Sequence, residues 1–161
     1  MKKIDINTTF TEYENIAELP ENIQQLYAAA EEAREKAYAP YSHFKVGAAV
    51  LLANGEVITG NNQENGAFPS GLCAERVALF AAGAAHPAVE AEALFITARA
   101  VDRDLDEPVA PCGACRQVMA ETERNQSTKM TVYFMGTTGP ILAAEGVESL
   151  LPYVFRFRDW E

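Results

Sequence analysis

The sequence CAER at residues 73–76 and the sequence PCGAC at residues 111–115 together contain all three cysteines of this 161-residue chain. Cys112 and Cys115 are three positions apart, so on one helical turn their sulfurs share a face. Cys73 supplies a third sulfur from another part of the chain. Three thiolates without a fourth protein ligand are typical of a catalytic zinc site, in which water fills the open position. The pattern predicts that the fold brings these two segments together around one metal.

A carboxylate stands close to the first of these cysteines. Glu75 lies two residues after Cys73, where it can handle the proton of a metal-bound water. The spacing alone leaves two other interpretations open: Cys112 and Cys115 as a redox pair, or all three cysteines as small buried hydrophobic residues. The odd number of cysteines makes a poor disulfide framework and fits a metal site better.

Longer segments of the sequence favour zinc. CAER at 73–76 and PCGACRQ at 111–117 resemble the two zinc signatures of the cytidine deaminase family. Upstream, YSHFKVGAA at 41–49 and NQEN at 62–65 resemble the substrate-binding segments of that family, in the same order. The resemblance runs from about residue 39 to residue 155, and four ordered motifs make it specific.

The resemblance implies a hydrolase that converts cytidine and deoxycytidine to uridine and deoxyuridine with release of ammonia. Zinc lowers the pKa of its water in such a site, and Glu75 carries a proton to the ring nitrogen and then to the departing amine. The family also implies one Zn²⁺ per chain and a homotetramer with shared active sites. The implied site comprises the zinc ligands Cys73, Cys112 and Cys115, the catalytic Glu75, Arg76 as a cation near the thiolates, the substrate contacts Phe44, Asn62 and Glu64, and Phe155 reaching a neighbouring subunit's site.

The residues implied in substrate binding also have simpler interpretations. Asn62 and Glu64 can hydrogen-bond a sugar hydroxyl in both directions, which discriminates against analogues that lack it. Taken alone, they would indicate a polar turn, and Phe44 would indicate a core residue.

The charge of the chain limits its partners. Its 13 basic and 23 acidic residues give a formal net charge of −10, so no positive field attracts nucleic acid or an anionic membrane. A small, uncharged substrate fits better. The N-terminus lacks the apolar run of a signal peptide, and the longest apolar stretch, residues 77–85, is too short to span a bilayer. We expect a cytoplasmic protein.

Local patterns predict an α/β fold in one domain of residues 1–161. Asn54-Gly55 is a hairpin signal, and strands and helices otherwise alternate, which predicts a mixed sheet covered by helices on both faces. This agrees with the three-layer α-β-α sandwich and five-stranded mixed sheet that the resemblance implies. Residues 1–20 lie outside the resemblance and form an arm or strand. The expected strands are 45–53, 56–60, 93–98, 130–135 and 141–144, and the expected helices are 21–38, 71–85, 111–123 and 147–151.

Other functions remain as alternatives. The same zinc centre could serve a deaminase of a modified or antibiotic cytosine nucleoside, although Asn62 and Glu64 favour an ordinary ribose. A zinc-stabilised binding module without activity is a third possibility, against which Glu75 argues. The aromatic residues of the C-terminal tail, Tyr153, Phe155, Phe157 and Trp160, indicate a subunit interface.

Overall fold

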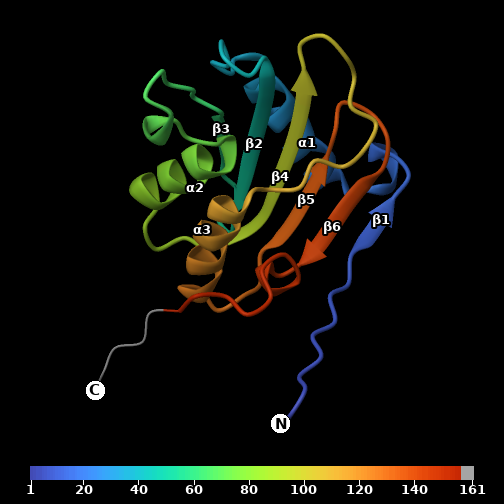
Figure 1. The fold of residues 1–161 in the computed structure, drawn as a ribbon, viewed down its shortest axis with the longest axis vertical. Helices are drawn as coiled ribbons and strands as arrows, with labels where there is room; N and C mark the ends of the chain where they lie inside the picture. Colours follow the sequence, from blue (N-terminus) through green and yellow to red (C-terminus); the bar gives the residue numbers. More distant parts are fainter. Residues whose placement is uncertain (157–161) are drawn as a thin grey trace.

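The computed structural model describes residues 1–156, so Phe157 and Trp160 of the aromatic tail lie outside the described residues. Within residues 1–156, a six-stranded sheet in the order β1-β6-β5-β4-β2-β3 carries three α-helices (Figure 1). The strands are β1 (Thr11–Tyr13), β2 (Phe44–Leu52), β3 (Val57–Asn61), β4 (Ala91–Ala100), β5 (Thr131–Met135) and β6 (Ile141–Glu145). The helices are α1 (Glu21–Glu35), α2 (Ala74–Ala85) and α3 (Gly113–Arg124), with short 3₁₀ turns at Ile16–Glu18, Phe68–Ser70 and Val147–Ser149.

The sheet is mixed because its connections differ in kind. β2 and β3 form the hairpin that Asn54-Gly55 predicts, and Gly55 has a φ of 85°, which such a turn requires. β4 and β5 are parallel, and α3 forms the crossover that a parallel pair needs. Both strands therefore end at the same edge of the sheet, and the chain leaves that edge to begin α3.

The helices cover both faces of the sheet, which gives the predicted three layers (Figure 1). On one face, the apolar side of α1, represented by Leu26 and Ala30, packs against Ala49 and Phe95 of the central strands. The ring of Phe95 also stacks on Tyr133 of β5 at 5.8 Å between centroids. Burial of these large side chains fixes α1 to the sheet.

On the opposite face, α2 and α3 lie side by side (Figure 1). Leu79 of α2 and Met119 of α3 meet in a second core over Leu94. The close packing of α2 depends on Gly60, since a Cβ there would lie 2.5 Å from the backbone nitrogen of Ala78. The N-termini of α2 and α3 lie close together, and the cysteines are at these N-termini.

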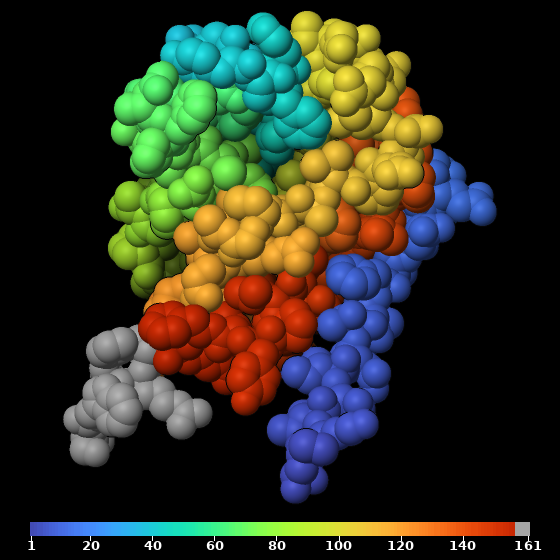
Figure 2. Space-filling model, in the orientation of Figure 1, coloured from blue at the N-terminus to red at the C-terminus, as the bar shows by residue number. Residues whose placement is uncertain are grey.

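The strand count differs from the prediction. The sheet has six strands because Thr11–Tyr13 pairs antiparallel with β6 and covers what would otherwise be an exposed edge. The alternation of apolar and polar residues through Ile4, Ile6 and Phe10 predicts a strand or an arm. Residues 1–10 form no strand and are exposed. Figure 2 shows this blue segment extending away from the rest of the molecule.

Three predicted helices differ in their limits. The helix predicted at 21–38 ends at Glu35. The helix predicted from residue 71 begins at Ala74, after the turn Phe68–Ser70, and the helix predicted from residue 111 begins at Gly113. The helix predicted at 147–151 is the short 3₁₀ turn Val147–Ser149. None of the helices in residues 1–156 is both long and apolar enough to span a bilayer.

Candidate metal centre and active site

The three cysteines meet where α2 and α3 begin. Cys73 and Cys112 are the N-cap residues of these helices, and Cys115 lies in the first turn of α3. The Sγ atoms of Cys73 and Cys112 are 3.8 Å apart, and those of Cys112 and Cys115 are 3.5 Å apart. All three sulfurs lie within 4.8 Å of one another. A tetrahedral zinc site with Zn–S bonds of about 2.3 Å separates its sulfurs by about 3.8 Å, so this donor set fits zinc.

The environment of these sulfurs favours a thiolate at Cys73. Neither N-cap side chain makes a capping hydrogen bond to the backbone of its helix, and both sulfurs stand at the positive end of a helix dipole. A hydrogen bond from Cys115 lowers the pKa of the Cys73 thiol to about 5, and the same contact raises the pKa of Cys115. Arg76 supplies the nearest positive charge, with its Nη2 3.5 Å from the Cys73 sulfur. Its Nε is buried and has no hydrogen-bond partner among the described residues.

Glu75 lies in the first turn of α2, beside a cavity. Its side chain is only 4% exposed, and it lines the cavity together with Cys73 and Cys112. Burial raises the pKa of its carboxyl group above the ordinary value for glutamate. A carboxylate in this position can exchange protons with a molecule bound in the cavity.

The cavity has a volume of about 740 Å³, which suits a small organic molecule. Its walls combine apolar and polar side chains. The apolar lining comprises Phe44, Val46, Phe68, Leu72, Ile96, Val109 and Ala110. Asn62 and Glu64 line it as well. The structure therefore gathers around one cavity the predicted residues Phe44, Asn62, Glu64, Cys73, Glu75, Arg76 and Cys112. Cys115 does not line the cavity, but its sulfur belongs to the cluster with Cys73 and Cys112.

Asn62 is already engaged with the backbone of β2. Its Oδ1 accepts from Val46 N at 2.8 Å, and its Nδ2 donates to the Phe44 carbonyl at 2.9 Å. Its amide therefore fixes the start of β2 and with it the position of Phe44. One N–H and one lone pair of the amide remain for another partner.

Glu64 is held at the rim of the cavity by the turn before β2. Its carboxylate accepts from the backbone nitrogens of Tyr41 at 2.9 Å and Ser42 at 3.2 Å, and from the Ser42 hydroxyl. The hydrogen bond from Ser42 lowers the pKa of this carboxyl group. The side chain is therefore kept ionised and oriented beside the cavity.

Phe155 stands apart from the other predicted residues. It does not line the cavity of its own chain, and its side chain is 72% exposed. Its carbonyl accepts from Gln117 Nε2 at 3.2 Å, which places it beside α3. A role in the site of a neighbouring subunit stays a prediction.

Six residues that line the cavity lie outside the four sequence motifs: Phe68, Gly71, Leu72, Ile96, Val109 and Ala110. Leu72 and Ala110 are near neighbours of the cysteine motifs, so their place in the chain was a usable signal. Ile96 lies inside a buried strand, where nothing in its identity marks it as a pocket residue. Val109 follows residues 101–108, whose acidic composition predicts only a surface loop.

Comparison with known proteins places this geometry in a family. The model of the cytidine and deoxycytidylate deaminase zinc-binding region matches residues 20–133. The chain is 41% identical over 138 residues to a cytidine deaminase of Sporosarcina psychrophila, an alignment that spans 86% of this chain and 94% of the relative. It is 42% identical over 136 residues to a cytidine deaminase of Halalkalibacterium halodurans, spanning 84% and 96% of the two chains.

Solved structures give the same result. The cytidine deaminase of Burkholderia pseudomallei superposes with a TM-score of 0.71 at 40% identity, covering 81% of this chain and 97% of the other. The cytidine deaminase of Mycobacterium tuberculosis superposes with a TM-score of 0.65 at 30% identity, covering 84% and 98%. Both likenesses extend over nearly the whole of the related chains.

Proposed function

This chain belongs to the zinc-binding cytidine and deoxycytidylate deaminase family, and from that premise we propose that its cavity binds a free cytosine nucleoside beside the three cysteines. The enzyme hydrolyses cytidine and deoxycytidine to the corresponding uracil nucleosides and ammonia. The observation that carries this function is the buried Glu75, which lines a cavity of nucleoside size together with two of the three clustered cysteines.

Cys73, Cys112 and Cys115 are the proposed ligands of one zinc ion per chain. When bound there, zinc lowers the pKa of a water molecule so that hydroxide is available at neutral pH. Arg76, with its guanidinium 3.5 Å from the Cys73 sulfur, offsets part of the negative charge that three thiolates bring. Its contact also orients the Cys73 side chain.

Glu75 carries the proton transfers in this proposal. Its carboxylate accepts the proton of the attacking water and delivers it to the ring nitrogen next to the amine-bearing carbon. The water oxygen bonds to the amine-bearing carbon, and Glu75 then carries the second proton from that oxygen to the amine. The C–N bond breaks, ammonia leaves, and the oxygen stays as a carbonyl of the uracil ring. One carboxylate acts as base and acid in turn, so the reaction needs no net proton from solvent. Burial of Glu75 supports this role because it excludes competing water.

Phe44, Asn62 and Glu64 are the proposed substrate contacts. Phe44 is held by Asn62 at the start of β2, and its ring offers an apolar surface to the base. Glu64 and the free N–H of Asn62 can bind a ribose hydroxyl. Since Ser42 and Tyr41 already orient the Glu64 carboxylate, little entropy is lost when the sugar binds.

The enzyme should discriminate against a phosphorylated substrate. Glu64 and Glu75 are acidic, and Arg76 is the sole basic side chain among the described residues that line the cavity. We therefore expect kcat/KM for CMP to be at least about 10-fold below that for cytidine, because like charges repel at close range. Timed ultraviolet spectra with cytidine, deoxycytidine and CMP measure this, and chelation followed by added zinc provides the control.

The same assay separates the alternatives. Turnover of cytidine that stops on chelation and returns with zinc supports the proposal. Turnover confined to a modified cytosine nucleoside would favour the second deaminase reading, and bound zinc without turnover would favour a binding module. Equal kcat/KM for cytidine and CMP would remove the charge argument.

The protein is further proposed to be a homotetramer in which Phe155 completes a neighbour's site. The exposed Tyr153 and Phe155 near the C-terminus support an interface. The proposal includes a single cytidine deaminase-like domain with residues 1–20 as an added arm. A cytoplasmic location is proposed because the three free thiols need a reducing compartment.

Phe155→Ala is expected to raise KM and weaken assembly together, since one side chain would serve both. A rise in KM of about 10-fold or more is reasonable for loss of a large aromatic contact. Light scattering across a concentration series and steady-state kinetics measure the two effects. Phe80→Ala is the matched control, because Phe80 is an exposed phenylalanine of α2 that does not line the cavity. A fully active wild-type monomer at micromolar concentration would refute the shared site.

A further inference from the structure

The cavity wall formed by Val109 and Ala110 belongs to a segment without helix or strand. Residues 101–111, here the 101–111 loop, connect the end of β4 to the start of α3. Most of its side chains are exposed, so hydrophobic burial does little to fix it. Something else must hold the loop where its far end forms the substrate pocket.

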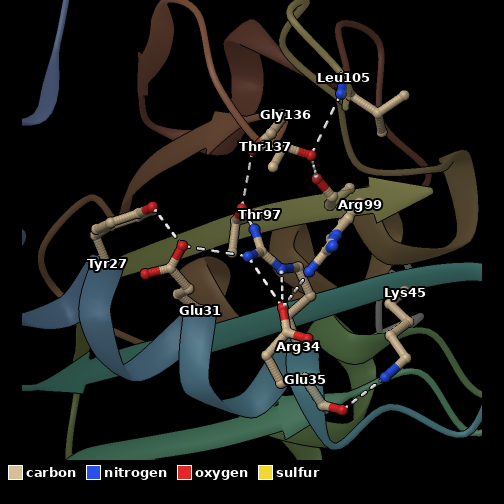
Figure 3. Close-up of polar contacts among 11 residues, drawn as sticks. Tyr27, Glu31, Arg34, Glu35, Lys45, Thr97, Arg99, Leu105, Gly136 and Thr137 are labelled. Carbon is tan, nitrogen blue, oxygen red and sulfur yellow. Dashed lines mark hydrogen bonds and ion pairs between the residues drawn. The ribbon is translucent and has the colours of Figure 1, made fainter. Parts of the chain in front are cut away.

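The middle of the 101–111 loop is tied to the turn between β5 and β6. The carbonyl of Leu105 accepts from the backbone nitrogens of Thr137 at 2.8 Å and Thr138 at 3.0 Å. The Leu105 nitrogen donates to Thr137 Oγ1 at 3.3 Å. The same hydroxyl donates to the Ala98 carbonyl at 3.3 Å. Thr137 therefore joins the loop to the end of β4 through one oxygen atom (Figure 3).

The turn between β5 and β6 is also fixed from the face of the sheet that α1 covers. The hydroxyl of Thr97, which is fully buried, donates to the Gly136 carbonyl at 2.9 Å. Arg34 Nη1 donates to the same hydroxyl at 2.8 Å. Because Glu31 and Glu35 each lie 3.2 Å from the guanidinium, the buried charge is compensated. Figure 3 shows this chain of contacts running from α1 through β4 to the turn.

The approach of loop and turn is close enough to require glycine. A Cβ on Gly136 would lie 2.3 Å from the Leu105 carbonyl oxygen and 2.7 Å from that of Glu107. The two backbones therefore lie in direct contact just before Thr137. Such an approach can be maintained only if the hydrogen bonds at Leu105 stay formed.

A separate contact holds the end of the loop that carries the metal ligand. Arg116 Nε donates to the Pro111 carbonyl at 2.8 Å, and its Nη1 donates to the Leu150 carbonyl at 2.8 Å. Pro111 is buried and immediately precedes Cys112. Cys112 is thus held from the α3 side, independently of Thr137.

We propose that Thr137 is a positioning residue for the substrate pocket: its hydroxyl anchors the 101–111 loop so that Val109 and Ala110 form the cavity wall. The inference rests on the deaminase function proposed above. Because the cysteines and Glu75 are held by α2, α3 and Arg116, loosening the loop should weaken substrate binding and leave the metal centre in place. The effect is confined to KM, and kcat and zinc content are unaffected.

The test is Thr137→Val, which keeps the shape of the side chain and removes the hydroxyl. KM for cytidine should rise about 10-fold, the order expected for losing one or two hydrogen bonds. kcat should stay within about threefold of wild type, and zinc content should not change. Thr137→Ser restores the hydroxyl and should return KM to near the wild-type value. Thr138→Val is the matched control. Thr138 is exposed, and it contacts Leu105 through its backbone nitrogen, which the substitution keeps.

Hydrogen exchange of peptides covering residues 101–111 gives a readout that does not depend on activity. Exchange should be about 5- to 10-fold faster in Thr137→Val than in the wild type or in Thr138→Val. A wild-type KM in Thr137→Val, a parallel loss of kcat and zinc, or unchanged exchange would overturn the proposal. A wild type without deaminase activity would refute the proposed function instead, and the exchange data would still decide whether Thr137 anchors the loop.

Discussion

Glu75→Ala should lose nearly all turnover while retaining the fold and the zinc. General acid–base catalysis contributes about 100- to 10,000-fold, and Glu75 is proposed to serve two proton transfers, so kcat should fall by at least that range. The side chain does not coordinate the metal in the proposed site. Because it is buried and desolvated, its removal should cost little stability. Steady-state kinetics with cytidine and elemental analysis for zinc measure the two halves.

Two further variants make this result specific. Glu75→Gln keeps the volume of the side chain and removes only its ability to carry a proton, so its kcat should fall nearly as far. Glu92→Ala removes an exposed carboxylate from β4 and should behave as the wild type. If Glu75→Ala stayed within tenfold of the wild-type kcat, Glu75 would have no place in the mechanism.

Cys112→Ser should lose both zinc and activity although the helix it caps is preserved. Serine is among the preferred N-cap residues, whereas the thiol of Cys112 makes no capping bond. The start of α3 should therefore be kept or improved. Loss of outer contacts to metal ligands already lowers affinity by about 10- to 100-fold, so loss of a ligand should exceed that. Elemental analysis of the purified protein gives the zinc content directly.

The control for this substitution lies on the same turn. Ala114→Ser places a serine at an exposed position one residue before Cys115 and should retain zinc and turnover. Melting temperatures distinguish metal loss from unfolding. Full zinc content and full activity in Cys112→Ser would show that the three cysteines are not the ligand set.

The chemistry of the site could be predicted from the sequence because it depends on residue types at short spacings. Cys112 and Cys115 share a face in any helical turn, and Glu75 follows Cys73 closely in any conformation. The Asn54-Gly55 turn likewise determines its own hairpin, because only such residues accept the required φ. These features are local, so they do not depend on how the rest of the chain folds.

Other parts of the site could not be predicted because they depend on which backbone groups meet in the folded state. Asn62 forms hydrogen bonds with Val46, 16 residues away, and with Phe44, 18 residues away. The hydrogen bond between Leu105 and Thr137 joins positions 32 residues apart. Every residue carries a backbone carbonyl, and every residue except proline carries a backbone N–H. The residue pattern therefore does not reveal which of these groups bond to one another in the folded state. For that reason, residues 101–108 resembled an ordinary acidic loop.

The sequence by itself determined which residues are proposed as ligands and proton carrier, and it determined the alternation of strands and helices, since each follows from side-chain chemistry or local periodicity. Only the tertiary structure decided that Thr11–Tyr13 becomes a sixth strand. This segment forms a strand because it pairs with the free edge of β6, about 130 residues further along the chain. Its own side chains contribute little to that choice. It also decided that Val109 and Ala110 complete the pocket. Their position is set by contacts at Thr137 and Arg116, which exist only once the sheet has brought these elements together.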